Sequence, residues 1–254
     1  MSRHDPIRVN YYDALERADQ FADWLFYLGA VLSIGSLFVV KEEYPLLYNF
    51  VMIGFAVSVL FMFVVGLGTK LYFSPRAEDG RRQDFFGSAF GVNLSHEKTD
   101  GYYNNDQTEP VRRIAAQVLE NSFFSKSIAL RMAFRERIKV SVYVFLWIVC
   151  LSRRESDFGF ILAASQAVFS EQVLAKFVRL EWLRIRFERT YENTYRLFKS
   201  KPSHADFNAM ALEILSFYET SKSNAAIPLS SAIFEKLNTK LSIEWDSIKK
   251  SLKI

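Results

Sequence analysis

Two long stretches without a charged residue constrain the fold of this chain more than any other feature. Residues 24–40 (WLFYLGAVLSIGSLFVV) give 17 uncharged positions in a row, and residues 44–69 (YPLLYNFVMIGFAVSVLFMFVVGLGT) give 26. A hydrocarbon core of about 30 Å is crossed by about 20 apolar residues in an α-helix, so both stretches qualify as membrane spans. The alternative is a buried hairpin in a soluble core, but a soluble helix rarely stays uncharged over about seven turns. We therefore predict a transmembrane hairpin over residues 23–70.

Two further apolar runs are shorter. Residues 140–152 and 158–170 have 13 residues each and are separated by the charged segment 153–157. Runs of about 10 to 14 residues are more often core helices or re-entrant segments than spans. The second run nevertheless continues to residue 175 if Glu171 is tolerated, and the first lengthens if Lys139 snorkels. We predict a second hairpin over residues 139–175, with a soluble or interfacial helix pair as the alternative.

The scarcity of turn-forming residues predicts that the rest of the chain is helical too. Only 10 Gly and 6 Pro occur among 254 residues, which argues against many short strands. We expect an amphipathic N-terminal helix over residues 1–22, a cytoplasmic middle segment over 71–138 and a helical C-terminal region over 176–254. In the middle segment we expect Thr108 to cap a helix that has Pro110 in its first turn, and residues 121–122 to interrupt it. The predicted fold class is all-α, a helical membrane protein with two transmembrane hairpins and a cytoplasmic helical domain.

The basic residues are placed asymmetrically along this predicted topology. If both hairpins cross, the outer loops at residues 41–43 and 153–157 carry only 3 of the 32 Lys and Arg. The positive-inside rule then places both termini and the middle segment in the cytoplasm. The pI of about 9.0 follows from these flanks, which face an anionic leaflet, and nucleic-acid binding is the weaker explanation because no basic run lies elsewhere.

No motif in the sequence indicates an enzyme. The chain has no phosphate-binding loop, no zinc-binding His-Glu-x-x-His and no Gly-x-Ser-x-Gly, and its single Cys150 lies in an apolar run without a neighbouring His. One Cys and three scattered His do not make a structural zinc site. We therefore expect no catalytic residue, no metal and no cofactor.

Small and polar residues inside the apolar runs are the candidates for helix contact and for gating. The small residues, which allow close backbone approach within one subunit or between subunits, are Gly29, Ser33, Gly159, Ala163 and Ala167. A carboxylate inside a span usually faces a bundle interior or water, so Glu171 is a candidate pore-lining or gating acid. Ser165 and Gln166 could line the same face, and Ser170, which stands next to Glu171, is a further pore or gating candidate. The alternative for Glu171 is an interfacial position paired with Lys176 or Arg179.

The middle segment holds the set that is most similar to a ligand site. Arginine beside tyrosine and asparagine suits phosphate binding together with base stacking. The candidates are Arg81, Arg82, Tyr102, Tyr103, Asn105, Arg112 and Arg113. The alternative is a structural collar, in which the arginines pair with Asp84, Glu109 and Glu120 and the tyrosines pack on it.

The order of these elements resembles a known family. Two pairs of apolar runs lie around a middle segment, which contains three short stretches: Gln83-Asp-Phe-Phe, the Gly-Tyr-Tyr at 101–103 and QVLENSFFSK at 117–126. In these features the chain resembles the four-span pore-forming effectors that accompany SMODS and SLOG nucleotide-signalling proteins in bacterial antiphage systems. The resemblance implies an antiviral-defence effector that oligomerises in the inner membrane and permeabilises it on a cyclic nucleotide or protein signal. Its expected partners are the lipid bilayer and further copies of itself, not nucleic acid. The alternative function is a non-conducting membrane scaffold or sensor that recruits a soluble partner.

Overall fold

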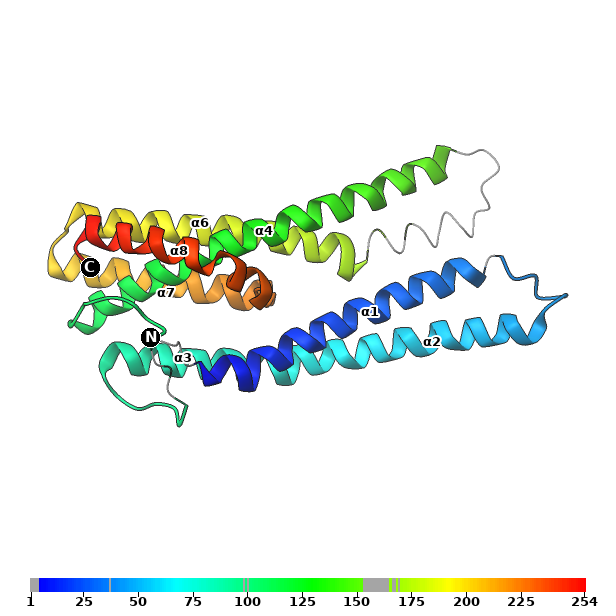
Figure 1. Cartoon of the computed structure of the whole chain (residues 1–254), viewed down its shortest axis with the longest axis horizontal. Coiled ribbons are helices and arrows are strands. Elements are labelled where there is room, and N and C mark those ends of the chain that lie inside the picture. The colour runs from blue at the N-terminus through cyan, green and yellow to red at the C-terminus, as the bar shows by residue number, and fades with distance from the viewer. Residues whose placement is uncertain are drawn as a thin grey trace. The chain divides into compact units, whose positions relative to one another are not determined.

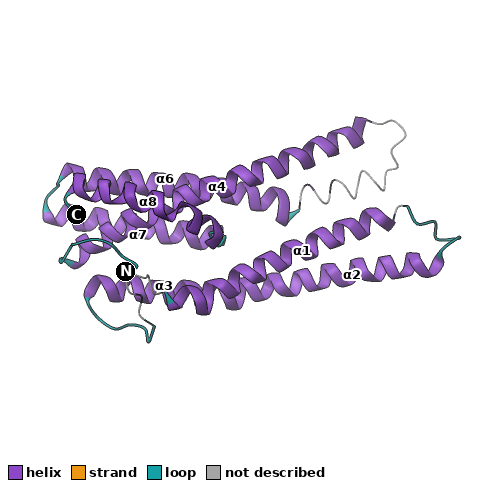
Figure 2. Ribbon diagram, viewed as in Figure 1, coloured by secondary structure: helices purple, strands orange, loops and turns teal. Residues whose placement is uncertain are grey.

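The structure is a computed structural model that describes residues 5–36, 38–97, 99, 101–152, 165, 168 and 170–254. Its regular elements within these ranges are all helices, and the described part of the chain contains no strand (Figure 2). This confirms the predicted all-α class. In chain order the elements are η1 (Arg8–Tyr12), α1 (Asp13–Ser36), α2 (Pro45–Gly68), η2 (Thr69–Phe73), α3 (Ser74–Phe90), α4 (Pro110–Ser152), η3 (Glu171–Ala175), α6 (Lys176–Ser200), α7 (His204–Ala225) and α8 (Ser231–Leu252), the three η segments being π-helical (Figure 1).

The chain divides into two compact units, each built from separate stretches of sequence. Unit 1 comprises Met1–Asp13, Ser74–Ala133 and Arg179–Ile254, and unit 2 comprises Ala14–Phe73 and Phe134–Val178. The middle segment and the C-terminal helices therefore fold together. Helices α4 and α6 each contribute residues to both units, so they connect the units through continuous backbone.

Unit 1 is organised around the N-terminal half of α4. Every residue from Ile114 to Glu120 is buried, because α3, α6, α7 and α8 contribute side chains around this stretch. Aromatic rings fill much of the core: Phe123 lies 6.2 Å from the Trp245 ring of α8, and Phe187 of α6 lies 5.7 Å from Tyr218 of α7. The helices of unit 1 thus pack around one shared hydrophobic core, as those of a globular domain do.

The start and the length of α4 differ from the sequence-based expectation. Pro110 does open the helix, but the carboxylate of Glu109, not Thr108, accepts the backbone N–H groups of Val111 and Arg112, at 3.2 and 3.1 Å. The expected interruption at residues 121–122 is wrong. The hydroxyl of Ser122 donates to the Leu119 carbonyl at 3.1 Å, so this buried polar group is satisfied within an unbroken helix of 43 residues.

Helices α7 and α8 each begin directly after a serine that caps them. Ser203 accepts the N–H of Asp206 before α7, and Ser230 accepts the N–H of Ile233 before α8, which is the usual N-cap arrangement. The helix before them, α6, ends at Ser200, ahead of Pro202. The boundaries of α7 and α8 therefore follow from local capping chemistry.

Unit 2 contains the hairpin of α1 and α2, whose helices contact through small residues. A Cβ built on Gly29 would lie 3.8 Å from the Cβ of Ser58, and one built on Gly54 would lie 3.3 Å from a methyl group of Leu32. The buried hydroxyl of Ser58 donates to the Gly54 carbonyl at 2.8 Å, so it is satisfied within α2 itself. A side chain at Gly54 would press on Leu32, whereas a methyl group at Gly29 would make an ordinary van der Waals contact with Ser58.

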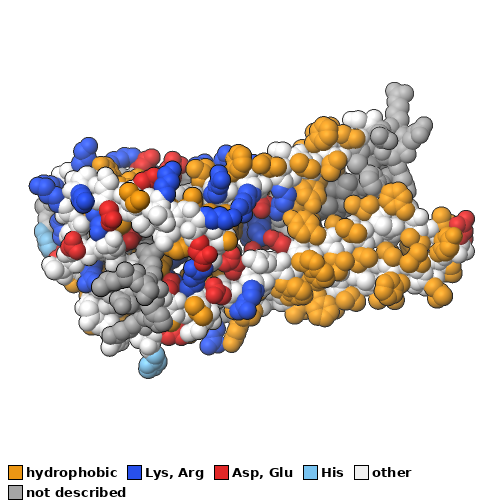
Figure 3. All heavy atoms as spheres, in the orientation of Figure 1, with side chains coloured by type: hydrophobic (Ala, Val, Ile, Leu, Met, Phe, Trp, Pro, Cys, Tyr) orange, Lys and Arg blue, Asp and Glu red, His pale blue; other side chains and the backbone are white. Residues whose placement is uncertain are grey.

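Helix α2 exposes its apolar side chains. With η2 and α3 it forms one continuous helix, Pro45–Phe90, whose most apolar 18-residue window has a mean hydropathy of 2.7 and is only 6% buried. Within the described residues this is the one helix that is long and apolar enough to cross a membrane. The other predicted spans are less complete: α1 ends at Ser36, residues 38–40 leave the helix, and most of the 158–170 run lies outside the described residues. In Figure 3 apolar side chains cover α1, α2 and the end of α4, whereas charged side chains gather on unit 1.

Candidate functional site

Arg81 forms the centre of a polar and aromatic cluster in unit 1. Its Nη2 donates to both carboxylate oxygens of Asp5, at 3.0 and 2.7 Å, and the two side chains are only 12% and 15% exposed. The guanidinium carbon lies 4.1 Å from the ring centroid of Tyr102 and 5.6 Å from that of Tyr12. Its Nη1 is buried and has no hydrogen-bond partner among the described residues. The N-terminal segment thus supplies the counter-ion of this arginine.

The two tyrosines of the Gly-Tyr-Tyr motif pack around this arginine. Their rings meet edge to face at 4.8 Å, and Tyr103 in turn contacts Phe85 of α3 at 5.9 Å. The hydroxyl of Tyr103 is buried without a hydrogen-bond partner in the described part of the chain. Burial, followed by the neighbouring Tyr102, raises the pKa of Tyr103 well above its usual range, so the phenol stays neutral.

The remaining members of the predicted ligand set lie at other places in unit 1. Arg82 is exposed and pairs with Asp79 one turn earlier in α3. The amide oxygen of Asn105 accepts the N–H of Gln107, while its amide nitrogen is buried without a partner among the described residues. The side chain of Gln107 accepts from Nε of Arg112 at 3.3 Å, and the Arg112 guanidinium lies 4.7 Å from the Phe207 ring.

Arg113 faces α3 instead, where its Nη2 lies 3.5 Å from the Ser88 hydroxyl. The seven candidates therefore do not share one common partner. Arg81, Tyr102 and Tyr103 form a contact cluster, Asn105 and Arg112 are linked through Gln107, and Arg82 lies at the surface.

In the alternative of a structural collar, the arginines were expected to pair with Asp84, Glu109 and Glu120. The hydrogen bonds to these three carboxylates come instead from Thr99, from the first turn of α4 and from Asn104. Asp84 accepts hydrogen bonds from the backbone and hydroxyl of Thr99, at 2.7 to 3.2 Å, and Glu109 caps α4. Glu120 accepts the backbone N–H of Asn104 at 2.9 Å. These carboxylates accept charge-assisted hydrogen bonds from loop and helix ends and so hold those ends in place.

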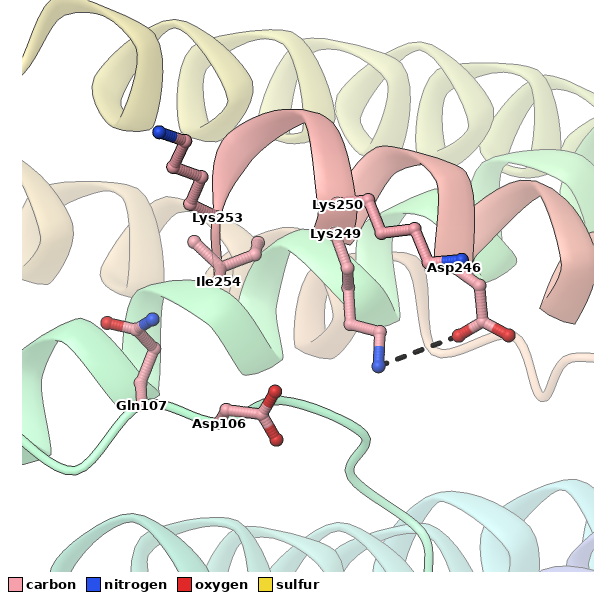
Figure 4. Close-up of a pocket in the computed structure, with 7 residues that line it drawn as sticks. All are labelled: Asp106, Gln107, Asp246, Lys249, Lys250, Lys253 and Ile254. Atoms are coloured by element: carbon pink, nitrogen blue, oxygen red, sulfur yellow. Dashed lines mark ion pairs between the residues drawn. The ribbon is translucent and has the colours of Figure 1, made fainter.

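A pocket of about 520 Å³ lies between the last turns of α8 and the loop that precedes α4 (Figure 4). Its lining residues are Asp106, Gln107, Asp246, Lys249, Lys250, Lys253 and Ile254. The ammonium of Lys249 lies 3.5 Å from a carboxylate oxygen of Asp246 and donates to the side-chain oxygen of Asn104 at 2.8 Å. The pocket has no strong preference for an anionic ligand, because aspartates lie beside its lysines. Its lining contains no aromatic ring, so it offers no surface on which a nucleotide base could stack.

Unit 2 holds a second ionic cluster, on the parts of the chain next to its apolar runs. Asp19 and Asp23 are four residues apart in α1 and therefore share one face of that helix. The ammonium of Lys176, the first residue of α6, lies 2.9 Å from a carboxylate oxygen of each. The lysine side chain is 14% exposed, whereas the aspartates are 33% and 29% exposed. Two carboxylates thus enclose one ammonium.

Neighbouring charges extend this cluster along α4 and η3. Lys139 pairs with Glu136 at 2.6 Å. Glu171 lies 3.6 Å from the ammonium of Lys70, and both side chains are about half exposed. Of the two partners expected for Glu171, Lys176 or Arg179, Lys176 is held instead by the two aspartates of α1.

The other predicted gating and packing residues are only partly described. Ser165 accepts the indole N–H of Trp147 at 2.8 Å, and Ser170 precedes η3 without a side-chain cap. On α1, Gly29 lies against Ser58, and the Ser33 carbonyl accepts the hydroxyl of Ser36 at 2.7 Å. The predicted residues outside the described part of the chain are Gln166, Gly159, Ala163 and Ala167.

Sequence reasoning missed Asp5, Asp19 and the role of Lys176. The signal for Asp19 and Asp23 is present, since they are two acids at helical spacing at the entry of an apolar helix. Comparison of the chain with models of protein families, with curated proteins and with solved structures gives no match. The function is therefore argued from these clusters and from the exposed apolar helix.

Proposed function

We propose that the protein is a membrane-embedded effector that permeabilises the bacterial inner membrane when unit 1 receives a nucleotide or partner signal. The observation that carries the proposal is the exposed apolar surface of α2, of which Leu46, Phe50 and Ile53 are 85%, 74% and 64% exposed. Burying one such side chain is worth about 1.5 to 3 kcal/mol, and soluble monomers rarely expose apolar patches beyond a few hundred Å². A lipid bilayer supplies the missing apolar surroundings for the whole helix.

The C-terminal half of α4 supports the same proposal. Val142, Phe145 and Leu146 are 52%, 64% and 52% exposed, so this half of the helix also presents apolar side chains that are not buried. The α1–α2 hairpin and this helix would together form the membrane part, with copies of the chain completing an oligomer. Both termini and the middle segment would lie in the cytoplasm, where the basic flanks face the anionic leaflet.

Unit 1 would receive the signal, because it combines a packed core with a cation held between aromatic rings. Arginine stacked on tyrosine is the side-chain chemistry that binds phosphate and bases, and the Arg81 cluster has this composition. Signal binding there would be transmitted along α4 and α6, the two helices that continue from unit 1 into unit 2.

The alternative is a non-conducting membrane scaffold that recruits a soluble partner through unit 1. It is favoured by apolar side chains that α6, α7 and α8 expose, among them Ile185 at 52%, Leu212 at 48% and Ile243 at 69%. Such residues, together with a polar rim, form the centre of many protein–protein interfaces.

The deciding experiment is expression of the chain from an inducible promoter in bacterial cells loaded with a membrane-potential dye. We expect induction to collapse the potential and arrest growth, either directly or once the signalling partner is co-expressed. A variant with two charges in α2, Phe50→Lys/Leu60→Arg, is expected to leave the potential intact. A potential that holds at high expression and with every co-expressed trigger would exclude permeabilisation and leave the scaffold.

A further inference from the structure

The hydrogen bonds of Arg81 leave one end of its guanidinium group unused. Its Nη2 alone donates to both carboxylate oxygens of Asp5, at 3.0 and 2.7 Å, whereas its Nη1 is buried and has no hydrogen-bond partner among the described residues. Arginine holds a carboxylate or a phosphate best through a fork of two parallel bonds, one from each of two nitrogens. Asp5 therefore uses only part of the binding capacity of this arginine.

A second unsatisfied donor lies in the same cluster. The hydroxyl of Tyr103 is buried without a hydrogen-bond partner in the described part of the chain, and its ring contacts that of Tyr102, which lies 4.1 Å from the guanidinium of Arg81. Burial raises the pKa of Tyr103, so the phenol stays protonated and its hydroxyl can donate. Buried polar groups of native proteins are nearly always satisfied. An N–H and an O–H left unsatisfied in one cluster therefore point to an acceptor that binds there.

Asp5 belongs to a segment, residues 5–12, that packs directly on α3. Ile7 is fully buried, and one of its methyl groups lies 3.6 Å from the Cβ position of Gly80, the residue before Arg81. The apolar contact and the ion pair of this segment are thus made at neighbouring residues of α3. A ligand that takes Arg81 from Asp5 would act on the attachment of the whole segment.

The other polar contacts of residues 5–12 with distant parts of unit 1 are more exposed. Arg8 donates to Glu235 of α8 at 2.7 Å and Asn10 donates to Glu97 at 2.8 Å, both at the surface. Exposed pairs of this kind contribute little to stability, so the segment depends more on Asp5 than on these contacts. Because η1 runs directly into α1, whose residues from 14 onward belong to unit 2, this attachment also fixes the start of the apolar hairpin.

We propose that Asp5 holds the place of a phosphate group on Arg81, and that a ligand with a terminal phosphate displaces Asp5 and releases residues 5–12 from α3 and α8. The phosphate would accept from both terminal nitrogens of Arg81 and from the Tyr103 hydroxyl, since it offers three acceptor oxygens where a carboxylate offers two. The contact of Asp5 with Arg81 is thus autoinhibitory, and its loss reaches α1 through η1. This inference rests on the proposed role of unit 1 as the receiver of the signal, and it adds the ligand class and the internal competitor.

The first test measures the affinity of the purified full-length protein in detergent for pyrophosphate, by titration calorimetry. Asp5→Asn removes the competitor and should bind pyrophosphate about tenfold more tightly than the wild type. Asp5→Glu keeps a carboxylate and should show no such gain. The double variant Asp5→Asn/Arg81→Gln leaves no uncompensated charge and should lose binding. Arg196→Gln, which removes an exposed arginine of α6, is the matched control and should bind as the wild type does.

The second test follows the release of the segment by hydrogen exchange of its backbone amides. Saturating pyrophosphate should remove the protection of residues 8–12 in the wild type and leave that of α7 unchanged. Adenosine diphosphate in place of pyrophosphate tests whether the phosphate is carried by a nucleotide, and the ligand that binds Asp5→Asn more tightly identifies the source. An Asp5→Asn variant that binds neither ligand more tightly than the wild type does, or amides of residues 8–12 that stay protected at saturation, would overturn the proposal.

Neither measurement depends on conduction through a membrane. If the ligand binds and exposes residues 8–12 to exchange while induced cells keep their membrane potential, the autoinhibitory contact stands and the permeabilising function fails. If induced cells lose their potential but Asp5→Asn gains no affinity, the permeabilising function stands and the role of Asp5 is structural.

Discussion

Single residues in this chain take partners from distant parts of the sequence. Arg81 pairs with Asp5, 76 positions away, and Lys176 pairs with Asp19, 157 positions away. Arg81 was a candidate from the sequence, but Asp5 and Asp19 were not, because each pairing depends on which faces of distant segments meet. Removing one partner of such a half-buried pair costs more than the pair contributes, because a charge is left without compensation.

The end of α3 makes Gly87 intolerant of a side chain. Gly91 has φ of +69°, and the N–H of Val92 bonds the Gly87 carbonyl at 3.0 Å, which is a Schellman motif. The same turn brings the Val92 carbonyl oxygen within 2.8 Å of the position of a Cβ on residue 87. We expect Gly87→Ala to destabilise unit 1 by about 1 to 3 kcal/mol, measured as a lower thermal unfolding midpoint in detergent.

Gly66→Ala is the control for this prediction. A Cβ at Gly66 meets no atom within 4 Å, so the substitution should leave stability unchanged or raise it by up to about 1 kcal/mol through helix propensity. An equal loss in both variants would show that the Val92 contact is not the cause.

Glu78 makes the stability of unit 1 depend on pH. Burial raises the pKa of Glu78 above its ordinary value of 4.5, against the opposing effects of Lys222, Ser74 and Arg82, while Glu219 adds to the rise. The folded state therefore binds more protons than the unfolded state above pH 4.5, and stability falls as pH rises through the raised pKa. We expect Glu78→Gln to become more stable than the wild type over this window and to match it below pH 4.5.

The measurement is the thermal midpoint of both proteins at a series of pH values. Glu192→Gln, whose carboxylate is exposed on α6, is the matched control and should show no such gain. A Glu78→Gln variant that is less stable than the wild type at neutral pH would mean that the carboxylate is needed by Lys222.

At the scale of elements, helix α4 shows where sequence reasoning succeeds and where it does not. Its start at Pro110 and its apolar stripe follow from local pattern. Its continuity through Asn121 and Ser122 does not follow from local pattern. These residue types end a helix when their side chains form hydrogen bonds with nearby backbone groups in a non-helical conformation. Here the packing of α6, α7 and α8 around the helix favours the helical alternative.

Helix α2 provides the prediction at this scale. Leu60 in α2 and Leu94 in the loop after α3 are similarly exposed, at 60% and 52%. If lipid surrounds α2, Leu60→Arg should lower the fraction of the chain that resists alkaline extraction from membranes, since arginine at a span centre costs about 2.5 to 3.5 kcal/mol on insertion. Leu94→Arg should have no effect, and equal behaviour of the two variants would argue against insertion of α2.

At the scale of the whole molecule, the two units differ in what surrounds them. Unit 1 buries a contiguous aromatic and aliphatic core from α3, α4, α6, α7 and α8, whereas α2 in unit 2 leaves most of its apolar surface uncovered. This difference corresponds to the sequence: the uncharged runs lie in unit 2 and the amphipathic helices lie in unit 1. Water and lipid as separate solvents for the two units would account for it.

The proposed topology can be measured directly. We expect green fluorescent protein to be fluorescent when fused to either end of the chain, because both ends would lie in the cytoplasm. Alkaline phosphatase inserted within residues 41–43 should be active, since this loop would lie outside. An inactive phosphatase within residues 41–43, together with an active phosphatase fused to the C-terminus, would mean that the topology is the reverse and that the basic flanks lie on the outer side.

The sequence by itself determined the all-α class, the position of the apolar runs and the start of α4 at Pro110, because hydrophobicity and helix-start signals act over neighbouring residues. The tertiary structure alone decided that the N-terminal segment supplies Asp5 to Arg81, that the middle segment folds with the C-terminal helices, and that Lys176 lies between Asp19 and Asp23. These outcomes depend on which faces of distant helices meet. No local pattern records that choice, because it is set by the packing of the whole core.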